Sequence, residues 1–469
     1  MPVGRFFRFC QGILYLLWYL DFDRCIFLRG ILVPAWWVQY FLDDLHINRI
    51  LRFFEPFTNT NFVHNSLGNG EGHRMKIESI RLKNFKAFRN AEFNDLSSFC
   101  VFVGANGTGK STIFSAFGFL RDAMTSNVNT ALEKLGGNRG FREVRSRNSD
   151  GPIEIELKFR DKADTPLTTY FLQIDEKDGR AYVEREVLKY RRGSGGQPWH
   201  FLDFSNGKGL AVTNEFEEVN DVRDLNREEQ DLKSMDILAI KGLAQFKKFP
   251  AVVAPGNLIE NWHVSDFHIS RARPEQDAGY AEHLSREGEN LSLVIQYLHN
   301  RHPEIFKKIL TLLKMRVPGM NDVESRTTEE GRVLLKFRDG SFEDPFLARY
   351  VSDGTIKMLA YLTLLYDPTP HPLLCVEEPE NQLYPKLLWE IAEEFRAYAK
   401  RGGQVFVSTH SPDFLNATRV EEVFWLVKQD GYTQVRRASD DQQVVAYMRE
   451  GDQMGYLWEQ GFLEGADPR

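Results

Sequence analysis

The chain has 469 residues, of which 42% are hydrophobic and 27% are charged, and its net charge is −7. These values are typical of a globular protein with one to three domains. The negative net charge excludes a uniformly basic surface as the basis of nucleic-acid binding, although it is compatible with a local basic groove.

The four cysteines are Cys10, Cys25, Cys100 and Cys375. The last two fall within predicted core strands, and their spacing is not that of metal ligands. They therefore resemble small buried hydrophobic residues in a reducing compartment, and we expect a cytoplasmic protein.

Residues 1–74 differ in composition from the rest of the chain. They are rich in aromatic residues, but the apolar runs 9–20 and 30–42 are shorter than the roughly 20 residues that span a bilayer. Residues 65–72 are polar and rich in glycine, as a linker is. We predict that Met75 is the natural start and that residues 1–74 are an extension from a misplaced start codon. The alternative is a membrane-surface or partner-binding segment; no stable membrane insertion is expected.

A complete phosphate-binding loop, G-x-x-x-x-G-K-S, occupies residues 104–111. A short apolar run, residues 99–103, precedes the loop and a helix-favouring run, residues 112–120, follows it, which is the context that the motif needs. The predicted nucleotide contacts are Gly104, Asn106, Gly107, Thr108, Gly109, Lys110, Ser111 and Thr112. The Lys110 ammonium should reach the β- and γ-phosphates of ATP, and the Ser111 hydroxyl should ligate Mg²⁺.

The alternation of apolar and polar residues predicts several strands. Residues 76–82 and 91–93 are predicted to pair with the strand at 99–103, which would then be central. Further alternating runs at 153–159, 168–174 and 182–190 predict an antiparallel sheet. Residues 221–249 and 281–316 are predicted to be helical, with Leu291, Val294, Ile295 and Leu298 on one apolar face.

A second phosphate-binding element is predicted at Ser352, Asp353 and Gly354, followed by the apolar helix 356–365. A short turn before a helix can contact a phosphate through its N–H groups and a hydroxyl. Taken alone, the pattern favours an ordinary helix cap by Ser352 or Asp353.

Acidic residues follow the next buried strand, residues 372–376. Glu377 and Glu378 are adjacent, so one is expected to hold Mg²⁺ while the other orients the attacking water. A third strand, residues 404–408, leads to His410, which is predicted to contact the γ-phosphate.

Together these motifs resemble the ABC-type ATPase heads of the RecF, SMC and OLD-nuclease group, most of all the single-chain RecF-like AAA-family ATPases of bacteria. The resemblance covers residues 75–469 and rests on the motif order as well as on the motifs. It is carried by residues 80–86, 104–111, 352–355, 377–380, 409–411 and 457–461.

The resemblance implies that ATP lies between two heads, with the phosphate loop from one protomer and Ser352 from the other. It also implies that Glu377 is the Mg²⁺-associated acid, Glu378 the catalytic base and His410 the switch histidine. Three departures stand out: the signature reads S-D-G-T, the first acid is Glu rather than Asp, and no glutamine of the Q-loop can be placed.

We therefore expect an α/β P-loop NTPase with an ABC-type head: a mixed central sheet, an antiparallel β subdomain and an inserted helical lobe. The predicted divisions are the extension 1–74 and the head 75–469, the latter made of lobes 75–150, 151–220, 221–350 and 351–469.

The predicted function is Mg²⁺-dependent ATP hydrolysis by a homodimer that closes on ATP, in DNA maintenance, DNA repair or anti-phage defence. DNA and a separate nuclease or other effector chain are the candidate partners, and Lys83, Lys86, Arg191 and Arg192 are the candidate DNA contacts. The alternatives are the nucleotide-binding subunit of an ABC transporter and a non-hydrolysing nucleotide-dependent interaction module.

Overall fold

The computed structural model describes residues 75–160, 166–190, 198–214 and 222–466, and the backbone of two short strands near the N-terminus. The chain divides into two compact units, Met1–Gly72 and His73–Arg469. In the first unit, β1 (Ile26–Leu28) pairs antiparallel with β2 (Ile31–Val33). None of the helices in the described part of the chain combines the length and the apolar character needed to cross a bilayer.

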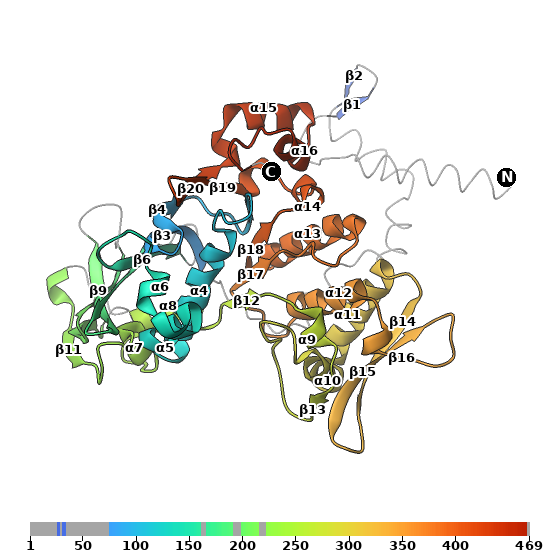
Figure 1. The fold of residues 1–469 in the computed structure, drawn as a ribbon, viewed down its shortest axis with the longest axis horizontal. Coiled ribbons are helices and arrows are strands. Elements are labelled where there is room, and N and C mark those ends of the chain that lie inside the picture. The colour runs from blue at the N-terminus through green and yellow to red at the C-terminus, as the bar shows by residue number, and fades with distance from the viewer. Residues whose placement is uncertain are drawn as a thin grey trace. The chain divides into compact units, whose positions relative to one another are not determined.

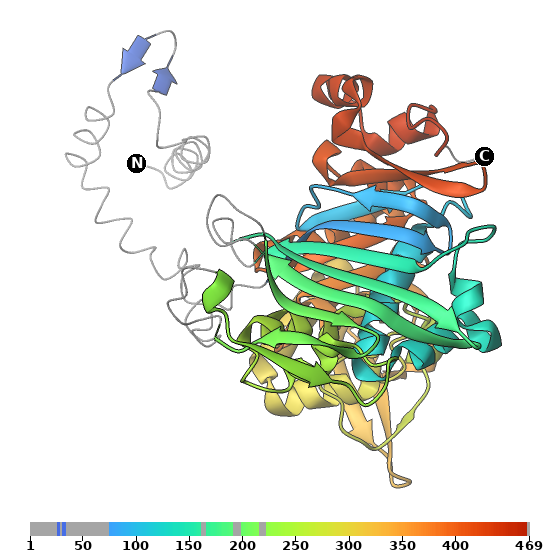
Figure 2. The ribbon, with the colours of Figure 1, turned by 90° about the vertical axis from the view of Figure 1, so that its left-hand side faces the viewer.

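The second unit contains an eight-stranded antiparallel sheet (Figure 2). Buried and half-buried residues alternate along strands such as β6 and β7, because one face of the sheet packs on the core. In sheet order the strands are β11 (Arg227–Asp231), β10 (Lys208–Val212), β9 (Trp199–Ser205), β8 (Arg180–Tyr190), β7 (Thr168–Lys177), β6 (Ile153–Arg160), β3 (Lys76–Phe85) and β4 (Phe88–Phe93).

A six-stranded sheet forms the centre of the same unit (Figure 1). Its first five strands are parallel and its last pair is antiparallel. In sheet order they are β12 (His263–Ser265), β17 (Leu373–Glu377), β18 (Gln404–Thr409), β5 (Phe99–Val103), β19 (Val423–Gln429) and β20 (Tyr432–Arg437).

The predicted pairing of β5 with β3 and β4 is wrong, although β5 does lie in the middle of a sheet. Every residue of β5 is buried, as in a parallel strand covered on both faces. β3 and β4 alternate instead, and they belong to the antiparallel sheet. The two kinds of burial pattern therefore separate the strands into two sheets.

Two hydrophobic cores lie on the two faces of the parallel sheet. In β5, Cys100 and Phe102 belong to the core shared with the antiparallel sheet. Phe99, Val101 and Val103 point into the opposite core. The helices of the first core are α4 (Lys110–Thr125), α5 (Val128–Gly136), α6 (Phe141–Val144), α7 (Ala239–Ala244) and α8 (Pro250–Glu260).

The opposite core is covered by the remaining helices and a small antiparallel sheet. The helices are α9 (Ile269–Ala272), α10 (Leu291–Arg301), α11 (Pro303–Arg316), α12 (Asp353–Leu365), α13 (Pro385–Lys400), α14 (Pro412–Asn416), α15 (Gln442–Glu450) and α16 (Met454–Glu459). The sheet contains β13 (Gln276–Asp277), β14 (Met320–Thr327), β15 (Arg332–Asp339) and β16 (Phe346–Leu347). Short 3₁₀ helices are η2 (Gly137–Arg139), η3 (Val222–Asp224), η4 (Ala348–Tyr350), η5 (Val420–Glu422) and η6 (Ala438–Asp440).

The helical predictions are partly wrong. Within 221–249 the described residues form η3, the edge strand β11 and only one short helix, α7. The charged sequence of β11 alternates between exposed and half-buried positions, as an edge strand does. In 281–316, helix begins only at Leu291, and a second helix starts at Pro303, whose fixed φ suits a first helical position. The predicted apolar face of α10 is confirmed, because all four of its residues are buried.

Candidate functional site

Three strand ends meet at one edge of the parallel sheet. Val103 of β5 is level with Thr409 of β18, and Glu377 of β17 is level with Ser408. Because these strands are parallel, the segments that follow them emerge side by side. The phosphate loop, the acidic turn and His410 are thus brought to one edge.

The loop backbone depends on glycine at defined positions. Gly107 and Gly109 have φ values of 79° and 99°, which L side chains rarely adopt. A Cβ on Gly104 would lie 2.6 Å from the Leu426 carbonyl oxygen and from Thr108 Oγ1. No side chain caps α4 and no acidic residue lies in its first turn, so its N-terminal N–H groups suit an anion.

Lys110 is buried beneath the loop. Its Nζ donates hydrogen bonds to the carbonyl oxygens of Gly104, at 2.7 Å, and Ala105, at 3.3 Å. Burial lowers the pKa of Lys110, while Glu378 and Glu380 oppose that shift. Around it the remaining predicted contacts differ in exposure: Asn106, Gly107 and Ser111 are exposed, Thr112 is half-buried and Thr108 is buried.

The two predicted magnesium ligands are neighbours. The Ser111 side chain lies close enough to the carboxylate of Glu377 to act on its pKa. Burial raises the pKa of Glu377, and the Ser111 side chain opposes that shift. A hydroxyl and a carboxylate supply the oxygen donors that Mg²⁺ prefers, so the pair fits that ion.

Glu378 leaves the strand in a left-handed conformation, with φ of 44°. Its N–H donates to the Ser408 carbonyl at 3.0 Å. Its carboxylate accepts a hydrogen bond of 2.9 Å from Asn381 Nδ2 and lies 3.3 Å from His410 Nδ1. The side chain of Glu378 is 35% exposed and that of Glu377 is 15% exposed, so Glu378 lies more toward the open side of the site.

Sequence reasoning missed the part that Glu380 plays. One oxygen of this buried carboxylate accepts hydrogen bonds from Thr409 Oγ1, at 2.8 Å, and from the His410 N–H, at 2.7 Å. The same oxygen lies 3.3 Å from His410 Nδ1. Glu380 therefore fixes the His410 segment against the acidic turn; its place at the end of E-E-P-E was the available signal.

Asp266 and Arg286 were also missed. β12 pairs in parallel with β17, Ser265 opposite Val376, so Asp266 is level with Glu377 at the same edge. The charge of Asp266 contributes to the raised pKa of Glu377, and the Arg286 guanidinium lies 3.7 Å from the Glu377 carboxylate. The acid at the end of a strand was visible in the sequence, but a three-residue strand leaves almost no periodicity to detect.

The predicted signature caps a helix. Ser352 accepts a hydrogen bond from the Thr355 N–H at 3.3 Å at the start of α12, and Asp353 pairs with Arg273. A Cβ on Gly354 would lie 3.1 Å from the Gln382 carbonyl oxygen, so this turn packs closely on the segment after the acidic turn. Ser352 and Asp353 are exposed, and a phosphate contact by Ser352 stays a prediction.

A buried lysine connects α12 to the acidic turn. Lys357 Nζ donates to the carbonyl oxygens of Asn381, at 2.8 Å, and Glu378, at 3.4 Å. Burial lowers the pKa of Lys357 to about 8, against the opposing charges of Glu380, Asp266 and Glu378. The start of α12 is therefore fixed directly against the backbone that carries Glu378.

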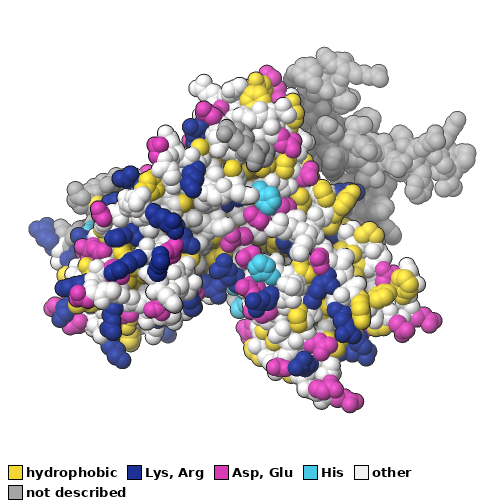
Figure 3. All heavy atoms as spheres, viewed as in Figure 1, with side chains coloured by type: hydrophobic (Ala, Val, Ile, Leu, Met, Phe, Trp, Pro, Cys, Tyr) yellow, Lys and Arg dark blue, Asp and Glu magenta, His cyan; other side chains and the backbone are white. Residues whose placement is uncertain are grey.

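The candidate DNA contacts are only partly described. Figure 3 shows Lys and Arg side chains gathered over the lobe that carries α5 to α8. Lys83 is already paired with Glu154 at 2.7 Å, and burial lowers the pKa of Lys86. Arg191 and Arg192 lie outside the described residues.

Residues 99–416, more than half of the chain, match a family model described as "AAA domain, putative AbiEii toxin, Type IV TA system". A curated relative, "DNA double-strand break repair Rad50 ATPase" of Methanococcus maripaludis, is 27% identical over 113 residues, which are 24% of this chain. The match spans 10% of that relative's length.

Among solved structures, the chain is similar to an SMC head bound to the C-terminal winged-helix domain of ScpA, with 14% identity and a TM-score of 0.48 over 77% of this chain and 97% of that one. An SMC head from Pyrococcus furiosus with an extended coiled coil, bound to the C-terminal domain of ScpA, gives 12% identity and a TM-score of 0.46 over 80% and 100%.

Proposed function

The chain belongs to this AAA-domain family and has the fold of an SMC- and RecF-like ABC-type ATPase head, and we propose that it hydrolyses ATP with Mg²⁺ between two copies of itself. One observation carries the proposal. A phosphate loop, the neighbouring residues Ser111 and Glu377, and the contacting pair of Glu378 and His410 all lie at one edge of the parallel sheet.

Each of these residues has a role in the proposal that its position supports. The Lys110 ammonium, released from the loop carbonyls, would neutralise the β- and γ-phosphates. Ser111 and Glu377 would hold Mg²⁺, which supplies charge neutralisation at the phosphates. Glu378 would accept a proton from the attacking water, and His410 would contact the γ-phosphate side of the site.

We propose that the second copy supplies the signature. Ser352 and Asp353 are exposed at the N-terminus of α12, where a hydroxyl and helix N–H groups are available to an anion. ATP held by the phosphate loop of one protomer would contact Ser352 and Asp353 of the other protomer only when the two copies come together. This would make hydrolysis depend on dimerisation.

We further propose that the protein acts in the cytoplasm in DNA maintenance, DNA repair or anti-phage defence, together with a separate effector such as a nuclease. The similar proteins support it: the family description mentions a toxin of a toxin–antitoxin system, and the curated relative is named for double-strand break repair. The two described cysteines, Cys100 and Cys375, are free and buried, which suits a reducing compartment.

The testing experiment measures phosphate release by the full chain with Mg²⁺ and with EDTA. Wild type should hydrolyse ATP slowly and only with Mg²⁺. Lys110→Ala should lose nucleotide binding and at least about 10²-fold of the rate, because the charge that neutralises the phosphates is gone. Lys134→Ala is the matched control, since that lysine is 55% exposed on α5. A Lys110→Ala protein with the wild-type rate would remove the phosphate loop from the mechanism.

A further inference from the structure

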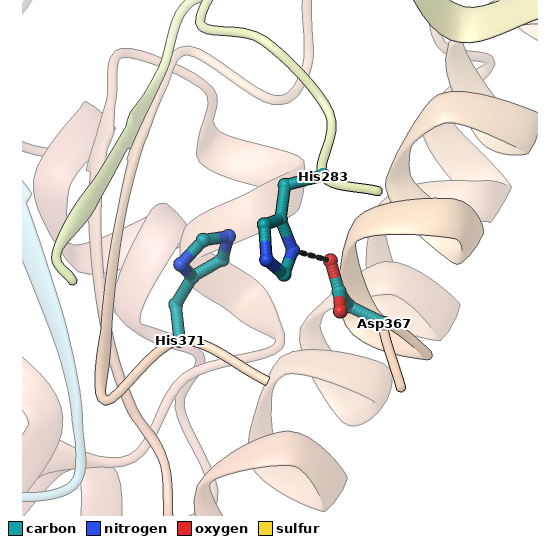
Figure 4. A group of neighbouring side chains, drawn as sticks. All are labelled: His283, Asp367 and His371. Atoms are coloured by element: carbon teal, nitrogen blue, oxygen red, sulfur yellow. Dashed lines mark hydrogen bonds and ion pairs between the residues drawn. The ribbon is translucent and has the colours of Figure 1, made fainter. Parts of the chain in front are cut away.

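A cluster of histidine and carboxylate side chains lies outside the nucleotide site (Figure 4). His283 comes from the segment between β13 and α10, while Asp367 and His371 come from the loop between α12 and β17. One donor atom from each residue lies within 4.8 Å of the others. Among the described residues, this is the group whose histidine and acidic side chains lie close enough together to hold a metal ion. Residues far apart in the chain are thus brought together by the fold.

Hydrogen bonds orient both imidazoles. His283 Nδ1 is 2.8 Å from Asp367 Oδ2, and His371 Nδ1 is 3.0 Å from the Asn261 carbonyl oxygen. The other carboxylate oxygen, Asp367 Oδ1, accepts from the Thr369 N–H at 2.8 Å. His371 is held as metal-ligating histidines commonly are, by a backbone carbonyl on one ring nitrogen, while the hydrogen bond between His283 and Asp367 joins two members of the cluster.

A third imidazole lies beside the cluster. His263 stacks on His371 with ring centroids 4.9 Å apart. The buried Nε2 of His263 has no hydrogen-bond partner among the described residues.

The cluster is separate from the proposed Mg²⁺ site. His371 precedes β17, whereas Glu377 is the last residue of that strand, so the two groups lie at opposite ends of it. The donors also differ, since imidazole nitrogen suits zinc-like ions and the pair of Ser111 and Glu377 offers only oxygen.

We propose that His283, Asp367 and His371 bind a divalent ion of the zinc type, with a nitrogen from each imidazole and an oxygen from the carboxylate. Three protein ligands with N and O donors are a usual set for zinc. In a tetrahedral site with bonds of about 2.0–2.1 Å, the donor atoms lie about 3.4 Å apart. The three side chains, whose donor atoms now lie within 4.8 Å of one another, would therefore move closer together when the ion binds. The side chain of His283 is 41% exposed on a connecting segment, which leaves it room for this adjustment.

Cobalt is the probe, because tetrahedral Co²⁺ absorbs visible light and replaces Zn²⁺ in such sites. The full chain is stripped with EDTA, dialysed, and titrated with Co²⁺ in millimolar Mg²⁺, which occupies oxygen-only sites. Wild type should bind one Co²⁺ with a tetrahedral spectrum. His283→Ala and Asp367→Asn should each weaken binding at least about tenfold. His299→Ala should bind as wild type, because His299 is an exposed histidine of α10.

Thermal unfolding with and without Zn²⁺ gives a second readout that does not depend on the spectrum. Zn²⁺ should raise the melting temperature of wild type and of His299→Ala, since an ion that binds only the folded chain stabilises it. The rise should be lost in His283→Ala. A wild-type chain that binds no Co²⁺, or equal binding by His283→Ala and His299→Ala, would overturn the proposal.

Discussion

The two adjacent acids of the site occupy different environments although they are neighbours in sequence. Glu377 ends β17 and is half-buried beside Ser111, whereas the left-handed backbone of Glu378 turns its side chain toward Asn381 and His410. Strand alternation alone predicts that the two side chains diverge. The contact with His410 could not be predicted, because His410 reaches Glu378 only through the fold, whereas Asn381 belongs to the same local turn.

Glu186 offers a test of the structure away from the active site. This fully buried carboxylate accepts hydrogen bonds from the Ala239 and Ile240 N–H groups at the start of α7 and from the Tyr170 hydroxyl. Burial raises the pKa of Glu186 to about 7, against the opposing hydrogen bonds. Since the folded pKa exceeds the unfolded value of 4.5, ionisation of Glu186 disfavours folding as pH rises between these two values.

We predict that Glu186→Gln removes this pH dependence. Between pH 5 and pH 8 the wild-type free energy of unfolding should fall by about 2 kcal/mol more than that of the variant. Urea unfolding at the two pH values measures the difference, with the exposed Glu133→Gln as control. An identical pH dependence in wild type and Glu186→Gln would show that the buried carboxyl does not titrate in this range.

At the scale of elements, long or strongly patterned segments could be predicted from sequence and short ones could not. The strands at β6, β7 and β8 and the helix after the phosphate loop are confirmed, because each repeats its period several times. β12 has three residues and η3 has three, too few to show a period. The sheet to which β5 belongs could not be predicted either. It is set by pairing with β18 and β19, which are distant in sequence, and no local pattern indicates such pairing.

Two glycines, one at the start of the phosphate loop and one in the helix that follows it, separate steric need from helix propensity. Gly104→Ala places a Cβ 2.6 Å from the Leu426 carbonyl oxygen, which should cost about 1–3 kcal/mol and weaken nucleotide binding. Gly118 lies within α4 and an added Cβ meets nothing within 4 Å, so Gly118→Ala should stabilise by about 0.5–1 kcal/mol. Thermal melts and nucleotide titrations of both variants check this. A Gly104→Ala protein with wild-type affinity and stability would show that the loop relaxes freely.

At the scale of the whole molecule, the boundary between the two compact units falls at Gly72 and His73. Among the residues that the structure describes, those of both hydrophobic cores around the parallel sheet come after that boundary. We therefore predict that a chain beginning at Met75 folds with a cooperative unfolding transition and retains the ATPase rate of the full chain. Loss of folding or activity on this truncation would show that the first 74 residues belong to the working protein.

The most direct measurement of the central claim is ATP turnover by Glu378→Gln, together with its mass in solution. An amide cannot accept the proton of the attacking water, but it leaves the phosphate loop and the magnesium ligands in place. With ATP and Mg²⁺ the variant should bind nucleotide, release phosphate at least about 10²-fold more slowly than wild type, and accumulate as a dimer by light scattering. The exposed Glu133→Gln should behave as wild type. A Glu378→Gln protein that hydrolyses ATP at the wild-type rate, or that stays monomeric with ATP bound, would contradict the proposed shared site.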